Sequence, residues 1–356
     1  MLSAVESLPS VWDRLERAGL PIMLYGMGDG ADKILRELAR RGLRAAEIFA
    51  SDEFVRGHSF RGYPVRRFSE ICAQYDRFII LVAFGTRDPD VMARLACMEA
   101  QFELYAPDVP VVGGAAFDLA FFRAHRSEFS RAAALLADEQ SRFVFLNSLC
   151  YKITGKLAYL RACESSPDEV YRALLRPTET ETYLDLGAYD GDTIREFLRY
   201  TNGRAQKIIA LEPDAYNFKK LCKKTERVTC LHPGAWSEDC TMQFSGRRGR
   251  GCALGTGVET VMRAVDSVLS GAPASYIKLD VEGAEYEALC GARNTIARFC
   301  PKLLCAAYHR NEDLFRLPLL IHALHPGYRL YLRHFPCVPA WETNWIAIEK
   351  EEWKEW

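Results

Sequence analysis

The chain has 356 residues, with 46 Lys and Arg against 47 Asp and Glu, and a formal net charge of −1. Hydrophobic residues make up 49% and charged residues 26%, which is ordinary for a globular chain and excludes extended disorder. The near-neutral charge lacks the basic excess of proteins that follow a nucleic-acid backbone, so we expect no nucleic-acid partner. The longest apolar run, 78–84, has seven residues, whereas a membrane span needs ~20.

The N-terminus and the cysteines indicate the compartment. Residues 1–20 alternate apolar and charged side chains and predict one amphipathic helix, without the basic leader and apolar block of a secretory signal. Twelve cysteines are scattered along the chain, and none of them forms a CxxC pair that would indicate a zinc or redox motif. We therefore expect free thiols and a cytoplasmic location.

Short apolar runs alternate with helical patterns in the first third of the chain, as in βαβ units around a parallel sheet. The first run is followed by a turn with Gly26, Gly28 and Gly30, although Ala31 replaces the last glycine of a full GxGxxG motif. Two interpretations stay open. The turn binds a nucleotide or nucleotide sugar, with Asp52 on the ribose, or it belongs to a Rossmann-like domain that serves packing or dimerisation. The predicted strands are 21–25, 45–50 and 78–84, and the predicted helix is 31–41.

The pattern changes twice further along the chain. Residues 117–175 have helical spacing, and a second α/β pattern begins at Thr182. The glycine-rich stretch 241–263 interrupts that pattern and predicts a β-ribbon insertion. Its Arg247, Arg248 and Arg250 either form a solvated tip or bind a substrate phosphate. The strands predicted in this half are 182–186, 207–211, 228–231, 275–279, 302–307 and the paired runs 328–333 and 344–348.

The residues after the first two of these strands indicate a ligand. Ligands of open α/β sheets bind beyond the carboxyl ends of the strands. The first strand leads into a turn in which Gly187 and Gly191 allow the backbone to approach a ligand closely, while several aspartates disfavour a phosphate. Glu212 follows Gly187 by 25 residues, at the next strand end, where an acidic side chain accepts hydrogen bonds from ribose. A nucleoside with a positive charge fits this turn, and S-adenosylmethionine is such a molecule.

Three motifs then occur in order: DLGAYDGDT, ALEPD and IKLDVEGAEYEAL. With them, residues 178–350 resemble the FkbM-type methyltransferases, a family of S-adenosylmethionine-dependent O-methyltransferases. The resemblance implies an α/β class I methyltransferase fold, with a Rossmann-like seven-stranded sheet that ends in a reversed hairpin. We divide the chain into a Rossmann-like accessory domain at 1–112, a helical connector at 113–176 and a methyltransferase domain at 177–356.

The resemblance also implies which residues act. The cofactor S-adenosylmethionine would be bound by Asp185, Gly187, Ala188, Asp190, Gly191, Glu212, Ala235 and Trp236. Asp280 and Glu282 would face the transferring methyl group, and the strand-end rule adds His309, so the predicted catalytic residues are Asp280, Glu282 and His309. We expect Asp280 to be the general base, with His309 as an equal rival because an imidazole pKa near ~6.5 suits that role. The aspartates together with His309 also raise the alternative of a magnesium or manganese site, because oxygen ligands suit hard cations, but no ligand spacing is diagnostic and the sequence assigns no metal.

The predicted function is therefore S-adenosylmethionine-dependent methylation of a hydroxyl on a carbohydrate, nucleotide sugar or related metabolite. The partner would be a small-molecule or glycan acceptor, which the N-terminal domain helps to present, and homodimerisation stays open. Two alternatives remain. One is a nicotinamide-dependent oxidoreductase that uses the Gly26 turn, and the other is a non-catalytic module that binds S-adenosylmethionine.

Overall fold

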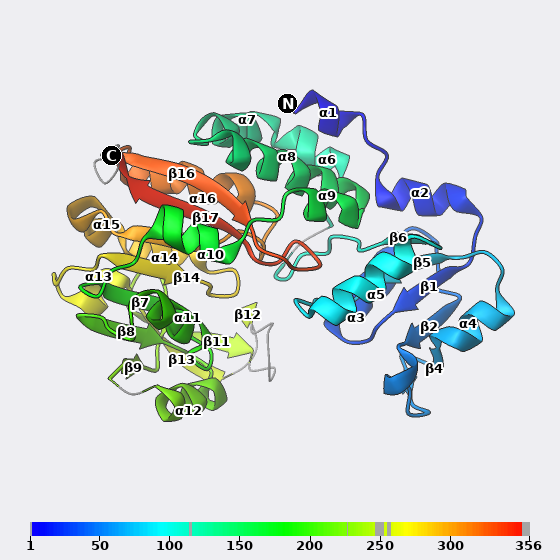
Figure 1. Cartoon of the computed structure of the whole chain (residues 1–356), viewed down its shortest axis with the longest axis horizontal. Coiled ribbons are helices and arrows are strands. Elements are labelled where there is room, and N and C mark those ends of the chain that lie inside the picture. Colours follow the sequence, from blue (N-terminus) through cyan, green and yellow to red (C-terminus); the bar gives the residue numbers. More distant parts are fainter. Residues whose placement is uncertain (1, 114–115, 226, 246–252, 255–257, 351–356) are drawn as a thin grey trace.

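A computed structural model of the chain describes residues 2–113, 116–225, 227–245, 253–254 and 258–350. It contains a smaller N-terminal sheet, a larger C-terminal sheet and a group of helices that lies above and between them (Figure 1). Among the residues that the structure describes, none of the helices combines the length and apolar character needed to cross a bilayer.

The N-terminal sheet has six strands in the order β3-β4-β2-β1-β5-β6, and every pair is parallel except β3 with β4. The strand order reverses at β1, which lies between β2 and β5. This is the alternating parallel architecture that the sequence predicts. The strands are β1 (Ile22–Tyr25), β2 (Glu47–Ala50), β3 (Ser59–Phe60), β4 (Tyr63–Arg67), β5 (Ile79–Val82) and β6 (Glu103–Tyr105), and the helices between them are α3 (Asp29–Arg40), α4 (Phe68–Gln74) and α5 (Pro89–Glu99).

The connecting region is helical, as its spacing predicts. Its central helix α8 contacts both halves: the Tyr151 hydroxyl donates to the carbonyl of Ala106, and the Ser141 hydroxyl accepts from the amide of Leu332. Since α8 contacts both the N-terminal and the C-terminal half, the structure marks no clear boundary at residues 112 and 176. The division of the chain at these residues stays a prediction. The elements are α6 (Leu119–Ala124), α7 (Arg126–Ala134), α8 (Glu139–Thr154), α9 (Leu157–Ala162), α10 (Pro167–Glu169) and a π-helical turn (Val170–Leu175).

The prediction of one helix over the first twenty residues is wrong. Two helices form instead, α1 (Ser3–Glu6) and α2 (Val11–Ala18), because Pro9 cannot continue a helix. Ser10 begins α2 by accepting a hydrogen bond from the second amide of the helix. Val5 of α1 packs in the core around α8, whereas α2 packs against the N-terminal sheet.

The C-terminal sheet has seven strands in the order β16-β17-β15-β14-β7-β8-β9, with β17 antiparallel to both of its neighbours. This confirms the seven-stranded sheet with a reversed hairpin. The strands are β7 (Thr182–Leu186), β8 (Lys207–Leu211), β9 (Thr229–Leu231), β14 (Tyr276–Leu279), β15 (Lys302–Ala306), β16 (Tyr328–His334) and β17 (Thr343–Glu349). The helices are α11 (Asp192–Tyr200), α12 (Ala215–Lys224), α13 (Val265–Leu269), α14 (Glu285–Gly291), α15 (Arg293–Phe299) and α16 (Asp313–Leu324).

The predicted ribbon insertion is confirmed as a small separate sheet in the order β10-β13-β11-β12. Its arginines Arg247, Arg248 and Arg250 lie outside the described residues. The strands are β10 (Gly234–Ala235), β11 (Cys240–Ser245), β12 (Ala253–Leu254) and β13 (Val258–Arg263).

The loop between β16 and β17 joins the two halves of the molecule (Figure 1). Thr86, after β5, and Val338, in this loop, exchange backbone hydrogen bonds of 2.7 and 3.0 Å. A side chain on Gly85 would place its Cβ 2.1 Å from the Trp341 ring. This close packing brings residues that follow β5 next to the carboxyl ends of the C-terminal strands.

Candidate active site

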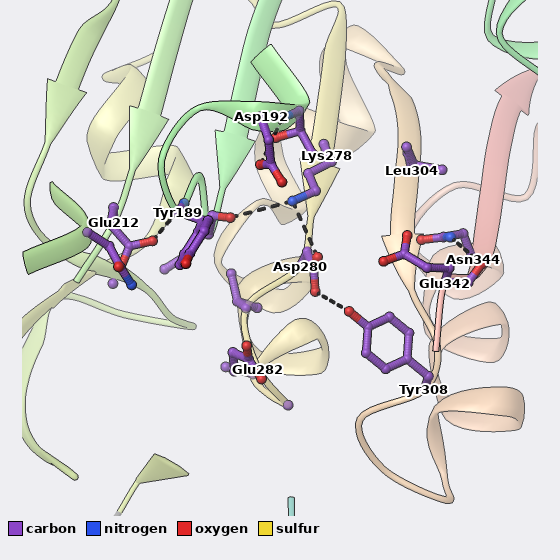
Figure 2. A pocket seen from close by; sticks show the side chains of 18 of the residues that line it. Tyr189, Asp192, Glu212, Lys278, Asp280, Glu282, Leu304, Tyr308, Glu342 and Asn344 are labelled. Atoms are coloured by element: carbon purple, nitrogen blue, oxygen red, sulfur yellow. Dashed lines mark hydrogen bonds and ion pairs between the residues drawn. The ribbon is translucent and has the colours of Figure 1, made fainter. Parts of the chain in front are cut away.

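A cavity of about 730 Å³ lies at the carboxyl ends of β7, β8, β14 and β15, where the strand-end rule places a ligand. Side chains from three parts of the chain form its wall: the strand ends, the β16–β17 hairpin and the N-terminal half. Figure 2 shows the first two of these parts. Arg87 and Val112 are the contribution of the N-terminal half.

The turn after β7 forms one side of the cavity, and Gly187 lies in its wall. Gly187 has a φ of +82°, and an added Cβ would lie 1.9 Å from the carbonyl oxygen of Asp280. Glycine is therefore required here by both the backbone conformation and the neighbouring chain. Tyr189 follows with a φ of +49° and also lines the cavity; sequence reasoning missed it.

We expect Gly187→Ala to destabilise the fold by about 1–3 kcal/mol and to weaken binding of S-adenosylmethionine at least tenfold, because the β7 turn must move away from Asp280. Urea unfolding and isothermal titration calorimetry measure the two effects. Gly203→Ala is the matched control, since Gly203 has a φ of +75° but nothing within 4 Å of the added Cβ. Equal losses in both variants would show that backbone conformation alone, and not contact with Asp280, constrains Gly187.

Glu212, after β8, is buried in the wall on the same side. Its two oxygens accept backbone hydrogen bonds of 2.8 Å from Tyr189 and 2.9 Å from Asp214, which fix the carboxyl group (Figure 2). Burial raises the pKa of Glu212 to about 7, although both backbone donors oppose the shift. Each oxygen keeps a further lone pair with which it can accept a hydroxyl from a ligand.

Ala235 and Trp236, after the next strand, are in the wall as expected. Ala188 and Gly191 are not. The Ala188 side chain is fully buried, and Gly191 packs against α12 at Leu221.

Asp190 also lies apart from the cavity, because its carboxylate ion-pairs with Arg195 at 3.0 Å and with Lys224. The turn therefore presents fewer acidic groups to a ligand than its sequence suggests.

Asp185 is expected to bind the cofactor, but the structure places it beneath the cavity and fully buried. Its carboxylate accepts a 2.5 Å hydrogen bond from the Thr193 hydroxyl and lies 3.5 Å from Nζ of Lys278. Lys278 does line the cavity, and it also lies 3.5 Å from Asp280 (Figure 2). Burial lowers the pKa of Lys278, but the two aspartates outweigh it and raise the pKa overall, so the ammonium group is charged. Sequence reasoning missed Lys278, although a lysine inside a buried strand is rare enough to signal a partner.

The three residues expected to be catalytic do lie close together. Asp280 and Glu282 line the cavity, and Nε2 of His309 lies 3.5 Å from a carboxylate oxygen of each. The Tyr308 hydroxyl donates a 3.0 Å hydrogen bond to Asp280. His309 itself is 1% exposed, and its Nδ1 lies 2.9 Å from Glu285.

The surroundings of His309 do not favour it as the general base. Burial lowers its pKa, but the carboxylates of Glu285, Asp280 and Glu282 outweigh burial and raise the pKa to about 10. An imidazole that already carries its proton at neutral pH cannot accept another.

The side chains on the far side of the cavity belong to no local sequence motif, so the sequence did not predict them. Glu342 and Asn344 come from the β16–β17 hairpin and face the cavity beside Tyr308 (Figure 2). Glu342 has a φ of +67° and ion-pairs at 3.1 Å with Arg87 of the N-terminal half. A non-glycine residue held in this conformation beside a cavity is a frequent feature of functional sites.

The Gly26 turn borders a second cavity of about 210 Å³, which shares Glu282, Tyr308 and Glu342 with the first. Two of the turn's glycines have a packing reason: a Cβ would lie 2.6 Å from the Phe84 ring at Gly26 and 2.4 Å from the Ala83 carbonyl at Gly30. Asp52, the candidate for ribose, accepts a hydrogen bond from the Ser69 hydroxyl instead and does not line this cavity.

Residues 185–335 match the family model of the methyltransferase FkbM domain. This segment is an FkbM methyltransferase domain. The chain is also similar to a solved structure, methyltransferase FkbM from Methylobacillus flagellatus KT, over 97% of this chain and 96% of that one, with 21% identity and a TM-score of 0.73. At this identity the similarity shows the fold only. The similarity covers the N-terminal half as well as the methyltransferase domain. No curated protein matches the chain.

Two further structures are more distant. An rRNA methylase from Streptococcus thermophilus covers 52% of this chain and 97% of its own, with 12% identity and a TM-score of 0.34. Fibrillarin from Aeropyrum pernix, solved with S-adenosyl-L-methionine, covers 50% of this chain and 73% of its own, with 12% identity and a TM-score of 0.32. The strand order of the methyltransferase domain is that of class I methyltransferases, as the sequence predicts.

Proposed function

We propose that the protein transfers a methyl group from S-adenosylmethionine to a hydroxyl of a carbohydrate, nucleotide sugar or related metabolite. The observation that carries the proposal is the arrangement around Glu212. A buried carboxyl group, oriented by two backbone amides, faces a cavity beside a glycine turn that leaves no room for a side chain. This arrangement suits a nucleoside, because the carboxylate can accept both ribose hydroxyls while the backbone of the turn lies against the ligand.

One side of the cavity would bind the nucleoside of S-adenosylmethionine, and the other side would bind the acceptor. When bound, S-adenosylmethionine supplies a methyl group on a sulfonium, and the bond from carbon to sulfur breaks as the bond from carbon to the acceptor oxygen forms. Glu212 and Gly187 hold the nucleoside side. Asp280 lies opposite, where its carboxylate can orient the acceptor hydroxyl and take the proton that this hydroxyl loses. Tyr308 and Lys278 hold the Asp280 carboxylate in place.

Binding and transfer test the proposal separately. Calorimetric titrations with S-adenosylmethionine and with NAD should show binding of the former only, and tight binding of NAD alone would contradict the proposal. Incubation with S-adenosylmethionine carrying a tritiated methyl group and with fractionated glycans and metabolites should label a hydroxyl, which mass spectrometry then locates. Cofactor binding without label in any fraction would instead support a non-catalytic module.

We expect the affinity for S-adenosylmethionine to fall about tenfold between pH 8 and pH 6. The pKa of Glu212 is raised to about 7, so the carboxylate that accepts the ribose hydroxyls is mostly ionised at pH 8 and mostly protonated at pH 6. Calorimetry at several pH values measures this dependence. In Glu212→Gln the affinity should be about tenfold lower at pH 8 and independent of pH. A wild-type affinity that is the same at both pH values would contradict the role of Glu212.

A further inference from the structure

The second cavity lies where the strand order of the N-terminal sheet reverses. Its wall includes Met27 after β1, Phe84 after β5 and Val109 after β6. In this sheet β1 pairs with β2 on one side and with β5 on the other. Ligands of open α/β sheets bind beyond the carboxyl ends of the strands at such a reversal. The N-terminal half therefore has a cavity at the position where this class of sheet binds a ligand.

Most of the side chains in this wall are apolar, and one of them is Trp341 of the β16–β17 loop. The position of Trp341 is fixed because its ring packs directly on Gly85, where an added Cβ would lie 2.1 Å from the ring. A fixed aromatic side chain can pack on a second ring in an offset-stacked or edge-to-face arrangement. The wall therefore favours an apolar, ring-shaped group.

The charged side chains of α3 at this cavity are paired within the protein. Nζ of Lys33 lies 2.6 Å from the carboxylate of Asp29 and donates a 2.7 Å hydrogen bond to the carbonyl of Val111. A phosphate group at this helix N-terminus would have to compete with Asp29 for the lysine. The charges therefore do not favour a nucleotide.

The volume of the second cavity points the same way. At about 210 Å³ it is smaller than the ~300–1,000 Å³ of pockets that hold a drug-sized ligand. An apolar cavity of about 150 Å³ is large enough to hold benzene. The second cavity therefore suits one ring of a larger molecule, and of the two interpretations of the Gly26 turn it does not favour nucleotide binding.

The second cavity adjoins the acceptor side of the larger one. Glu282, Tyr308 and Glu342 line both cavities, whereas Glu212 lines the larger one only. The Tyr308 hydroxyl donates to Asp280, the carboxylate to which the proposed function assigns the acceptor hydroxyl (Figure 2). A molecule whose hydroxyl lies at Asp280 can therefore extend past Tyr308 into the second cavity without entering the nucleoside side.

We propose that the second cavity binds an apolar ring of the acceptor, an inference that rests on the proposed methyl transfer. The acceptor is then a hydroxyl-bearing molecule with an apolar ring, such as an aryl glycoside. Its hydroxyl lies beside Asp280, and its ring contacts Met27 and Trp341. Because Met27 and Phe84 belong to the N-terminal half, this half selects the acceptor while the methyltransferase domain binds the cofactor.

Binding of fluorobenzene tests the second cavity without any acceptor. The broadening of the fluorine NMR signal is followed as the full chain is added. We expect one saturable site with a dissociation constant of about 1 mM or below, which is reasonable for a ligand of this size in an apolar pocket. Met27→Trp places a larger side chain in the cavity and should raise this dissociation constant about tenfold or more.

A second filling variant and a matched control accompany this measurement. Val111→Trp fills the cavity from another segment of its wall and should have the same effect, while circular dichroism shows that each variant is folded. Met92 is half-buried on α5 in the same half and lines neither cavity, so Met92→Trp should change the dissociation constant less than about twofold. Absence of saturable binding, or equal losses in Met27→Trp and Met92→Trp, would overturn the proposal.

Transfer of the tritiated methyl group connects this cavity to the reaction. The labelled product should contain an apolar ring, and Met27→Trp should lower the labelling about tenfold while the dissociation constant for S-adenosylmethionine changes less than about twofold. A labelled product without such a ring, or unchanged labelling in Met27→Trp, would contradict the proposal. Fluorobenzene binding without cofactor binding refutes the methyltransferase function alone, and methyl transfer without fluorobenzene binding refutes the second-cavity site alone.

Discussion

Asp280→Asn is expected to lower the rate of methyl transfer about 10²- to 10⁴-fold while the dissociation constant for S-adenosylmethionine changes less than threefold. The amide has the shape of the carboxylate and can still accept the hydrogen bond from Tyr308. It cannot take a proton from the acceptor hydroxyl. The part of Asp280 that contacts the glycine turn is its backbone carbonyl, beside Gly187, and the substitution leaves this contact unchanged.

Transfer of the tritiated methyl group measures the rate, and calorimetry measures cofactor affinity. Asp76 is an exposed aspartate in the N-terminal half. Asp76→Asn is therefore a control for the loss of one carboxylate, and it should change neither the rate of transfer nor the cofactor affinity. A loss of cofactor affinity of tenfold or more in Asp280→Asn would assign Asp280 to cofactor binding instead of catalysis.

Lys278→Met should lower the free energy of unfolding by about 3–5 kcal/mol, the usual cost of removing one partner from a buried ion pair. Methionine fills a similar volume, so the loss is mainly electrostatic. Without the ammonium group, the fully buried Asp185 and the neighbouring Asp280 lose the positive charge between them. We expect methyl transfer to fall as well, because Lys278 holds Asp280 in place.

Urea unfolding monitored by circular dichroism measures the loss. Lys223→Met, at an exposed position of α12, is the matched control and should stay within about 0.5 kcal/mol of the wild type. Combining Lys278→Met with Asp185→Asn should recover part of the stability, because the second change removes the buried charge that the first one leaves alone. Full stability of Lys278→Met alone would show that the pair contributes nothing to the fold.

The sequence predicted both sheets because buried parallel strands have a local signature. Runs such as Lys207–Leu211 are short, apolar and followed by turn residues, and the reversed hairpin at Tyr328–Glu349 is visible as two paired runs. The same approach failed at the N-terminus. Apolar spacing alone predicts one helix there, whereas Pro9 separates two helices.

The candidate site was partly predictable for the same reason. Gly187, Glu212, Asp280 and Glu282 all come directly after strands, and the carboxyl ends of parallel strands lie at one edge of a sheet. No such rule predicts which residues of the hairpin and of the N-terminal half line the cavity. Glu342 and Arg87 meet at the cavity only because the β16–β17 loop packs on the N-terminal sheet.

The sequence by itself therefore determined the class of fold, the edge of the sheet at which a ligand would bind and the acidic character of that edge. Only the tertiary structure decided which acidic groups face the cavity. Asp185, in β7, turns inward to Lys278, and Asp190, in the turn that follows, turns outward to Arg195 and Lys224, although both lie within three residues of Gly187. The physical reason is that strand patterns depend on neighbours in the chain, whereas the direction of a charged side chain depends on counter-charges supplied by distant elements.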